Sequence, residues 1–276
     1  MINTTKIGQR VALLRKERGF TQEQMAIRLN VTAQAVSKWE NGNALPDTAL
    51  LPYLANVLEV SIDRLLTGRD LVGKSSPYDR QYEKKEYYWG LEHSSLAEQI
   101  VNIMKDQLPG KRLIDIGSGE GRDSIYFANC GFIVDSLELS LPGIEKIKHY
   151  SQLADCMVNI LCANMIGYQL AVYYDVIYSM GALQFLPPEQ RQKHFEKYKR
   201  YTNIGGCNAH LVFVEKSFVA RAPDWEKTEF FYQSGDLAAY YHDWEIIHCG
   251  EKIIDCNSAN IPHRHAVSYI IARKHC

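Results

Sequence analysis

The sequence predicts an all-helical domain followed by an α/β domain with a mostly parallel sheet. Residues 6–66 carry apolar side chains at helical spacing and show no alternating strand pattern. From residue 112 onward, short apolar strands alternate with amphipathic helices, which is typical of a parallel sheet covered on both faces. Residues 67–77 contain glycine, serine and proline without periodicity, and this composition indicates a linker between the two domains.

Length and composition suit two ordinary globular domains. The chain has 276 residues, of which 46% are apolar and 23% are charged. We expect domains at residues 1–68 and 79–276, joined by a linker at 69–78. The net charge is −1, no apolar run approaches the ~20 residues that span a bilayer, and the N-terminus lacks a signal-peptide core. The sequence therefore predicts a cytoplasmic protein with no membrane partner.

The cysteines give no sign of a disulfide framework or a structural zinc site. Their number, seven, is odd, and no C-x-x-C spacing occurs. We expect reduced thiols that are mostly buried.

The first domain contains the start and stop signals of five helices. Thr21 and Thr32 are suitable N-caps, and Gly19 is placed to end the opening helix. The expected helices are an opening helix as far as Gly19, then Gln22–Leu29, Ala33–Glu40, Asp47 to about Leu58, and a short helix that opens at Ser61.

The stretch "FTQEQMAIRLNVTAQAVSKWENG" places two helices and a short turn within about twenty residues, which is helix-turn-helix spacing. Residues 6–66 resemble the lambda-repressor/Cro-like family, also called xenobiotic-response-element-type regulators. The resemblance implies binding to double-stranded DNA. The family's DNA-contacting positions fall on Gln22, Thr32, Gln34, Ser37 and Lys38. Such side chains suit base edges and phosphates, because glutamine pairs with adenine through two hydrogen bonds.

The charge of this domain favours a dimer on DNA. Through residue 70 there are nine Lys and Arg residues against seven Asp and Glu residues, a net charge of +2. A monomer would bind weakly, since phosphate contacts supply most of the affinity. The family resemblance implies a homodimer on a palindromic site. The alternative left open is a module for dimerisation or protein interaction, and Trp39 is expected in the core.

The second domain shows a regular order of strands and helices. Its last two strands follow one another without a helix, which predicts an antiparallel end to the sheet. The expected strands are 112–116, 132–138, 158–163, 174–180, 209–215, 244–249 and 266–272, and the expected helices are 94–108, 122–130, 141–153, 188–202 and 234–242.

A glycine-rich turn follows the first strand, in the order Asp115-Ile-Gly117-Ser-Gly119-Glu-Gly121. It lacks the Lys-Ser or Lys-Thr of a phosphate-binding P-loop, and its third glycine comes one position early for a dinucleotide loop. An acid before the first glycine suits a ligand with a positive centre and no phosphate. Glu138 ends the next strand, 17 residues after Gly121, where a carboxylate can accept from both ribose hydroxyls.

Residues 80–274 resemble the class I S-adenosylmethionine-dependent methyltransferases. Within this class they look most like the tellurite-resistance methyltransferase family, through the stretches "HSSL", "DIGSGEGRDSIYFANCGFIVD", "YDVIYSMGALQFL" and "SGDLAAYYHDWEI". The resemblance implies a Rossmann-like, seven-stranded, mostly parallel sheet whose last strand is antiparallel.

The resemblance also implies S-adenosylmethionine as cofactor. Asn164 stands where this class usually has an acid that binds the adenine amine. The implied cofactor-binding residues are Trp89, Asp115, Gly117, Ser118, Gly119, Gly121, Glu138, Leu139, Asn164, Met165 and Ser179.

The methyl acceptor is expected to be a small molecule. An activated donor leaves the protein mainly the tasks of positioning and desolvation, so an anionic acceptor needs cationic partners rather than a base. Arg122, His263, Arg264 and His265 are the candidate catalytic residues. Other interpretations are a solvated turn for the last three and a helix cap for His93.

We expect no metal, on the argument that adjacent histidines on a strand point to opposite faces and that no acid is near in sequence.

Three functions remain to be compared. The favoured one is a methyltransferase for a metalloid oxyanion such as tellurite or selenite, or for a thiol, whose DNA-binding domain regulates its own expression. The second is a transcriptional regulator that uses the donor site as a sensor without turnover, and Asn164 favours it. A DNA methyltransferase is disfavoured, because no Asn/Asp-Pro-Pro-aromatic run follows the fourth strand and no Pro-Cys occurs.

Overall fold

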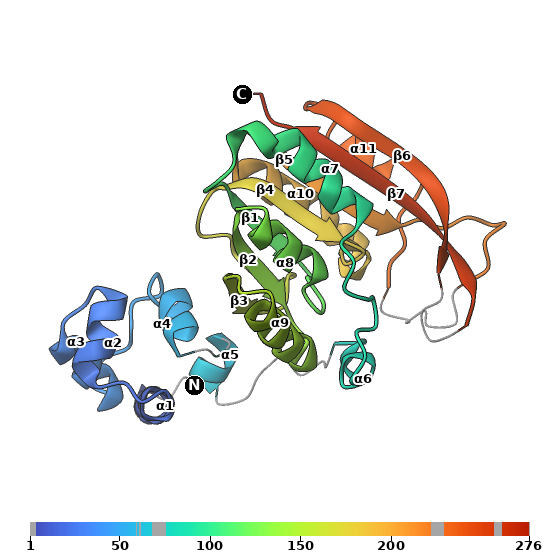
Figure 1. The fold of residues 1–276 in the computed structure, drawn as a ribbon. Coiled ribbons are helices and arrows are strands. Elements are labelled where there is room, and N and C mark those ends of the chain that lie inside the picture. Colours follow the sequence, from blue (N-terminus) through green and yellow to red (C-terminus); the bar gives the residue numbers. More distant parts are fainter. Residues whose placement is uncertain are drawn as a thin grey trace. The chain divides into compact units, whose positions relative to one another are not determined.

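The computed structural model describes residues 4–58, 60, 62–67, 76–221, 229–256 and 261–275. The chain divides into two compact units, Met1–Ser75 and Ser76–Cys276, whose elements are labelled in Figure 1. Most of the expected linker, residues 69–75, lies outside the described residues.

The secondary structure described for the first unit consists of helices joined by turns. Both predicted N-caps are confirmed: the Thr21 hydroxyl accepts from the Gln24 amide, and the Thr32 hydroxyl accepts from the Ala35 amide, each at 3.1 Å. Gln24 completes a capping box by accepting from the Thr21 amide. The helices are α1 (Thr4–Glu17), α2 (Gln22–Leu29), α3 (Ala33–Glu40), α4 (Leu51–Val57) and α5 (Ile62–Thr67).

The fourth helix begins later than the sequence analysis predicts. The expected start at Asp47 is wrong: the Asp47 carboxylate accepts from the Ala49 amide at 2.8 Å, and α4 begins at Leu51. Pro52 gives the physical reason, since it has no N–H to donate to a preceding turn of helix. The residues between Asp47 and Leu51 therefore form turns.

The core of the helical unit includes a close approach of two helices. Apolar side chains from α1 to α5 pack together, and Trp39 is buried among them, as expected. Gly8 of α1 lies so near α3 that an added Cβ would stand 2.1 Å from the Trp39 carbonyl oxygen. This glycine sets the distance between α1 and α3, although the sequence analysis did not single it out.

The second unit contains the remaining described elements. They are α6 (Asp79–Tyr82), α7 (Ser95–Met104), η1 (Lys105–Gln107), β1 (Arg112–Ile116), α8 (Arg122–Asn129), β2 (Ile133–Glu138), α9 (Leu141–Leu153), β3 (Val158–Cys162), β4 (Tyr174–Met180), η2 (Leu183–Phe185), α10 (Pro188–Arg200), β5 (Thr202–Phe213), α11 (Asp236–Tyr240), β6 (Glu245–Cys256) and β7 (His263–Arg273).

The seven described strands form one sheet in the order β3-β2-β1-β4-β5-β7-β6. Pairs from β3 to β5 are parallel, whereas β7 is antiparallel to both β5 and β6. The predicted α/β class and the antiparallel last strand are therefore confirmed. The first five strands and β6 all end at one edge of the sheet, and β7 begins there.

Helices cover the two faces of this sheet, as Figure 1 shows. On one face, α10 and α11 pack on the side chains of Ile114, Ile177 and Ile270. On the other, α7 and α8 pack on Val134, Val176 and neighbouring residues. The central strands β1 and β4 are thus buried on both faces. Their burial fixes the positions of the loops that follow their carboxyl ends.

The main differences from the predicted elements concern lengths and one short helix. β5 begins at Thr202 rather than at 209, and β6 continues to Cys256 rather than ending at 249. The short helix α6 was not predicted. Among the described residues, no helix combines the length and apolar character that crossing a membrane requires.

We predict that Gly8→Ala lowers the free energy of unfolding of the helical unit by about 1–3 kcal/mol. The gain in helix propensity, about 1 kcal/mol, is smaller than the cost of displacing a backbone carbonyl. Chemical denaturation followed by circular dichroism measures the change. Ile27→Ala is the control, because Ile27 lies on α2 of the same unit and its side chain is 78% exposed. Equal effects of the two variants would contradict the prediction.

Candidate functional site

The glycine turn between β1 and α8 depends on backbone angles that favour glycine. Gly117, Gly119 and Gly121 have φ values of 72°, 59° and 87°. A Cβ on Gly117 would stand 2.3 Å from the Ala182 Cβ, so this glycine allows the loop after β4 to pack closely. Gly119 is different, because its missing Cβ would point at the Tyr82 hydroxyl, 2.9 Å away.

Asp115 lies beneath this turn and is 2% exposed. The Ser124 hydroxyl donates to its Oδ2 at 2.7 Å. Burial raises the pKa of Asp115 to about 8, against the lowering effect of the Ser124 hydrogen bond. A carboxyl group with this pKa is mostly protonated at neutral pH, and a cation placed beside it would favour its ionised form.

Glu138 holds two loops together at the end of β2. Its Oε2 accepts from the Gly119 amide at 2.7 Å, and its Oε1 accepts from the Leu139 and Ser140 amides at 2.8 and 2.7 Å. Burial raises the pKa of Glu138 to about 7, although these backbone hydrogen bonds act to lower it. A carboxylate has about four acceptor positions, so one remains for a ligand hydroxyl.

Aromatic side chains from residues 78–89 lie over the glycine turn. Trp89 Nε1 donates to the Tyr82 hydroxyl at 3.0 Å, and the Trp89 Cδ1 is 4.0 Å from the position of a Gly119 Cβ. Tyr78 stacks on Tyr82 with ring centroids 5.7 Å apart. Trp89, one of the expected cofactor residues, lies beside the turn, whereas the sequence analysis did not single out Tyr82, which contacts Gly119 more closely.

Backbone and side-chain bonds fix this aromatic segment. Lys146 Nζ lies 2.6 Å from the Glu120 Oε1, while the Glu120 Oε2 accepts from the Trp89 amide at 3.2 Å. Arg122, which the sequence analysis placed at the acceptor, donates instead to the Trp89 carbonyl at 3.0 Å. Arg122 therefore positions the aromatic segment at the start of α8.

The other expected cofactor residues take different positions around the turn. The Ser118 hydroxyl accepts from Ser136 at 2.7 Å. Ser179 is fully buried and donates to the Ile116 carbonyl at 2.8 Å, so its hydroxyl joins β4 to β1 rather than facing a ligand. Asn164 is exposed, and its Oδ1 accepts from the Ile166 amide at 2.9 Å.

Packing also determines the positions of Met165 and His93. Met165 packs on the core of the sheet. The cap interpretation of His93 is wrong, because Ser94 caps α7 and the His93 ring stacks on Tyr126 at 3.7 Å.

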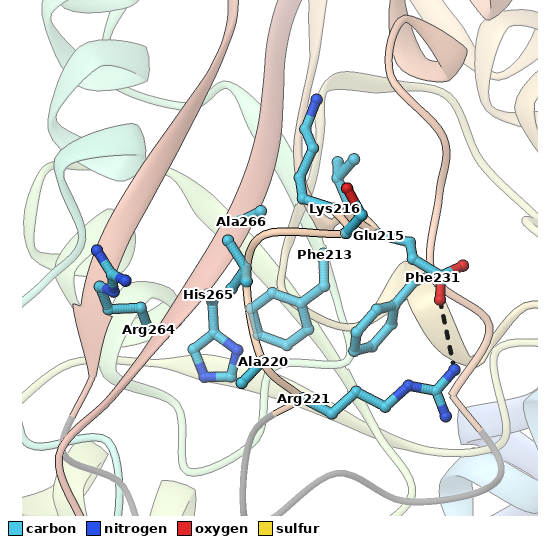
Figure 2. Close-up of a pocket in the computed structure, with 12 residues that line it drawn as sticks. Phe213, Glu215, Lys216, Ala220, Arg221, Phe231, Arg264, His265 and Ala266 are labelled. Atoms are coloured by element: carbon cyan, nitrogen blue, oxygen red, sulfur yellow. Dashed lines mark hydrogen bonds and ion pairs between the residues drawn. The ribbon is translucent and has the colours of Figure 1, made fainter.

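A cavity of about 230 Å³ lies where β5 ends and β7 begins. Figure 2 shows the side chains that surround it. It is lined by three cationic side chains, Lys216, Arg221 and Arg264, and by one carboxylate, Glu215. Arg221 and Glu215 form an ion pair at 3.4 Å. Lys216 pairs with Glu251 at 2.6 Å, so three cations face two carboxylates. The remaining excess of one positive charge suits an anionic ligand.

The four predicted catalytic residues do not form one group. Arg264 and His265 line the cavity, and His263 lies beside His265 with their Nε2 atoms 2.9 Å apart. The expectation that these histidines point to opposite faces is wrong, because they are two residues apart and side chains on a strand alternate. Arg122 belongs to the aromatic segment.

Sequence reasoning missed several residues of the cavity. Phe213 and Phe231 contribute aromatic walls, and Lys216 and Arg221 contribute charge. The only available signal was the pair of cations in "VEKSFVAR" directly after the fifth strand.

The expected DNA-contacting residues lie at the start of α2 and along α3. Gln34 and Lys38 are exposed on α3, and Ser37 is half-buried between them. The Thr32 hydroxyl already caps α3. Gln22 Nε2 donates to Glu40 at 2.7 Å, and this carboxylate is also paired with a buried arginine of α1.

Each of the two units matches a known protein family. The model of the tellurite resistance protein TehB family matches residues 77–261, and a helix-turn-helix model matches residues 11–65. Because the first of these covers more than half of the chain, the chain belongs to the TehB family and carries an additional N-terminal helix-turn-helix domain.

Individual relatives agree with this assignment. A Haemophilus influenzae protein named "Probable S-adenosyl-L-methionine-dependent methyltransferase TehB" is 25% identical over 174 residues, which cover 62% of this chain and 59% of the relative. The chain thus matches about three fifths of that relative. The HTH-type transcriptional activator BcrR of Enterococcus faecalis is 34% identical over 82 residues, or 30% of this chain and 40% of BcrR.

The solved structure of Haemophilus influenzae TehB shows the same fold, with a TM-score of 0.57 and 21% identity. The match covers 71% of this chain and 65% of that chain.

We predict that Asp115→Asn changes the pH dependence of stability. The folded pKa of Asp115, about 8, exceeds its ordinary value of 3.8, so the wild type loses stability as pH rises between these values. The asparagine variant has no such loss. The melting temperature of the variant minus that of the wild type should therefore increase as pH rises across this range. Thermal unfolding at a series of pH values measures the difference. A difference that stays constant with pH would contradict the assignment.

Proposed function

We propose that the chain is an S-adenosylmethionine-dependent methyltransferase that modifies a small anionic acceptor. The observation that carries this proposal is the set of buried carboxyl groups around the glycine turn. Asp115, Glu120 and Glu138 are each at most 6% exposed. Lys146 pairs with Glu120, and burial raises the pKa of Asp115 and Glu138. A ligand with cationic groups would stabilise the ionised forms of these two carboxyl groups, which a phosphate would not, and this separates the turn from phosphate-binding loops.

The residues present fit this cofactor. Because Gly119 has no Cβ, the backbone of the turn can be approached closely, as the Tyr82 hydroxyl does at 2.9 Å from the Cβ position. Asp115 is suited to an ammonium group, and the remaining acceptor position of Glu138 to one ribose hydroxyl. Aromatic rings beside the turn suit a sulfonium by cation–π attraction. The cofactor supplies an activated methyl group when it is bound.

The protein then has to hold the acceptor and exclude water. Orientation of this kind is worth roughly 7–11 kcal/mol in well-ordered systems. Arg221 and Lys216 at the cavity would hold an anionic acceptor without any base, because such an acceptor has no proton to lose. The acceptors that fit this charge are a metalloid oxyanion such as tellurite or selenite, or a thiolate.

The helix-turn-helix domain is proposed to bind double-stranded DNA as a homodimer in the cytoplasm. Support comes from the exposed Gln34 and Lys38 on α3 and from the similarity to transcriptional regulators. A chain that joins this domain to an enzyme is suited to control its own expression.

Mass spectrometry of methylated products tests the catalytic proposal. The full-length protein is incubated with S-adenosylmethionine labelled in the methyl group and with tellurite, selenite and a panel of thiols. We expect labelled methyl groups on at least one of these acceptors. Donor binding by calorimetry without any labelled product would favour a sensor that does not turn over.

We predict that Gly119→Arg abolishes donor binding. The arginine side chain would collide with the Tyr82 hydroxyl, which lies 2.9 Å from the Cβ position, and the backbone would also be strained at φ 59°. Gly205→Arg is the matched control, because Gly205 has a φ of 78° and nothing within 4 Å of its added Cβ. Calorimetry should show no donor binding for the first variant and unchanged binding for the second. Unchanged binding by a folded Gly119→Arg protein would contradict the proposal that the donor binds at the glycine turn.

We predict that the double variant Gln34→Ala, Lys38→Ala weakens operator binding by at least about tenfold, since one lost base contact costs about 1–3 kcal/mol. Methyl transfer should be unaffected. Operator fragments selected from genomic DNA and gel-shift titration measure the first activity, and the labelled-methyl assay measures the second. Ile27→Ala is a control, because this exposed side chain lies outside the predicted contacts. Loss of both activities together would argue against independent units.

A further inference from the structure

The end of the β6–β7 hairpin brings a cysteine and two histidines to one face of the sheet. Cys256 is paired directly with His263 in the antiparallel ladder, and Ile254 is paired with His265. Residues directly opposite each other share a face, and so do residues two apart on one strand. Cys256, His263 and His265 therefore project to the same side, while Arg264 projects to the other.

The potential ligand atoms of these three residues lie close together. The cysteine sulfur and one ring nitrogen of each histidine are all within 4.8 Å of one another. The two Nε2 atoms are 2.9 Å apart. Two imidazole nitrogens on a tetrahedral zinc ion stand about 3.3 Å apart, so a small opening of this contact accommodates an ion.

The surroundings orient both imidazole rings for this purpose. His263 Nδ1 is 2.7 Å from the Ile261 carbonyl oxygen, so Nδ1 carries the proton and Nε2 presents its lone pair. The His265 ring stacks on Phe213, with centroids 4.5 Å apart and planes inclined by 18°. A backbone carbonyl that accepts from the second ring nitrogen is typical of histidines that bind metals.

We propose that Cys256, His263 and His265 bind one divalent transition-metal ion of the zinc class. Thiolate and imidazole are the ligands that zinc prefers, and three protein ligands leave its fourth position for an exchangeable ligand such as water. Cys256 forms no disulfide. Since His265 also lines the cavity at the end of β5, the ion stands at the same edge of the sheet as the glycine turn.

Cobalt substitution tests the proposal on the full-length protein. Co²⁺ reports tetrahedral thiolate ligation through its visible absorption and a thiolate-to-cobalt charge-transfer band. We expect saturation at one equivalent per chain and displacement of cobalt by Zn²⁺. Cys256→Ser should lose the charge-transfer band and bind at least about tenfold more weakly, in line with the effect of disturbing metal sites.

Cys249→Ser is the matched control, because Cys249 lies on the same strand but is exposed and outside the cluster. Its spectrum should equal that of the wild type. A wild type without the charge-transfer band, or an equal loss in both variants, overturns the proposal.

A second measurement needs no variant and therefore does not depend on folding of a mutant. Iodoacetamide labelling of the wild type is followed by peptide mass spectrometry, with and without Zn²⁺. We expect Zn²⁺ to slow labelling of Cys256 by at least about tenfold and to leave Cys249 unchanged. Equal rates at Cys256 under both conditions overturn the proposal. Neither measurement involves S-adenosylmethionine, so failure here is distinct from failure of the proposed methyl transfer.

Discussion

The Glu138 carboxylate is the constraint on which the geometry of the candidate site depends. It accepts three backbone N–H groups from two loops, one after β1 and one after β2. These bonds fix Gly119 relative to the end of β2. The three bonds are shielded from water, because Glu138 is 6% exposed. The buried Glu138 side chain thus holds the glycine turn in position.

The glycine turn and the cavity at the end of β5 differ in the charged groups that surround them. Carboxyl groups surround the glycine turn, whereas cationic side chains line the cavity at the end of β5. A cationic donor and an anionic acceptor would each meet opposite charge. The aromatic segment over the turn is held by Lys146, Glu120 and Arg122, so its anchors are polar although its contact surface is apolar.

Local signals allowed much of the fold to be predicted. The caps at Thr21 and Thr32 act within one helical turn, and the turn from Asp115 to Gly121 is a contiguous motif, so the sequence alone locates them. The start of α4 could also have been predicted, because Pro52 is visible in the sequence. The shared face of His263 and His265 follows from a strand period of two, which was misapplied. By contrast, the contact of Tyr82 with Gly119 and the cluster with Cys256 depend on packing and strand register, which no local pattern specifies.

The raised pKa values of Asp115 and Glu138 link occupancy of the site to exchange of protons with solvent. Burial keeps a large fraction of these two carboxyl groups protonated near neutrality. A cationic ligand that settles against them stabilises their ionised forms and expels protons. The heat of association then includes the ionisation enthalpy of whichever buffer takes up those protons. Titrations in buffers of different ionisation enthalpy would report how many protons leave, without any structural probe.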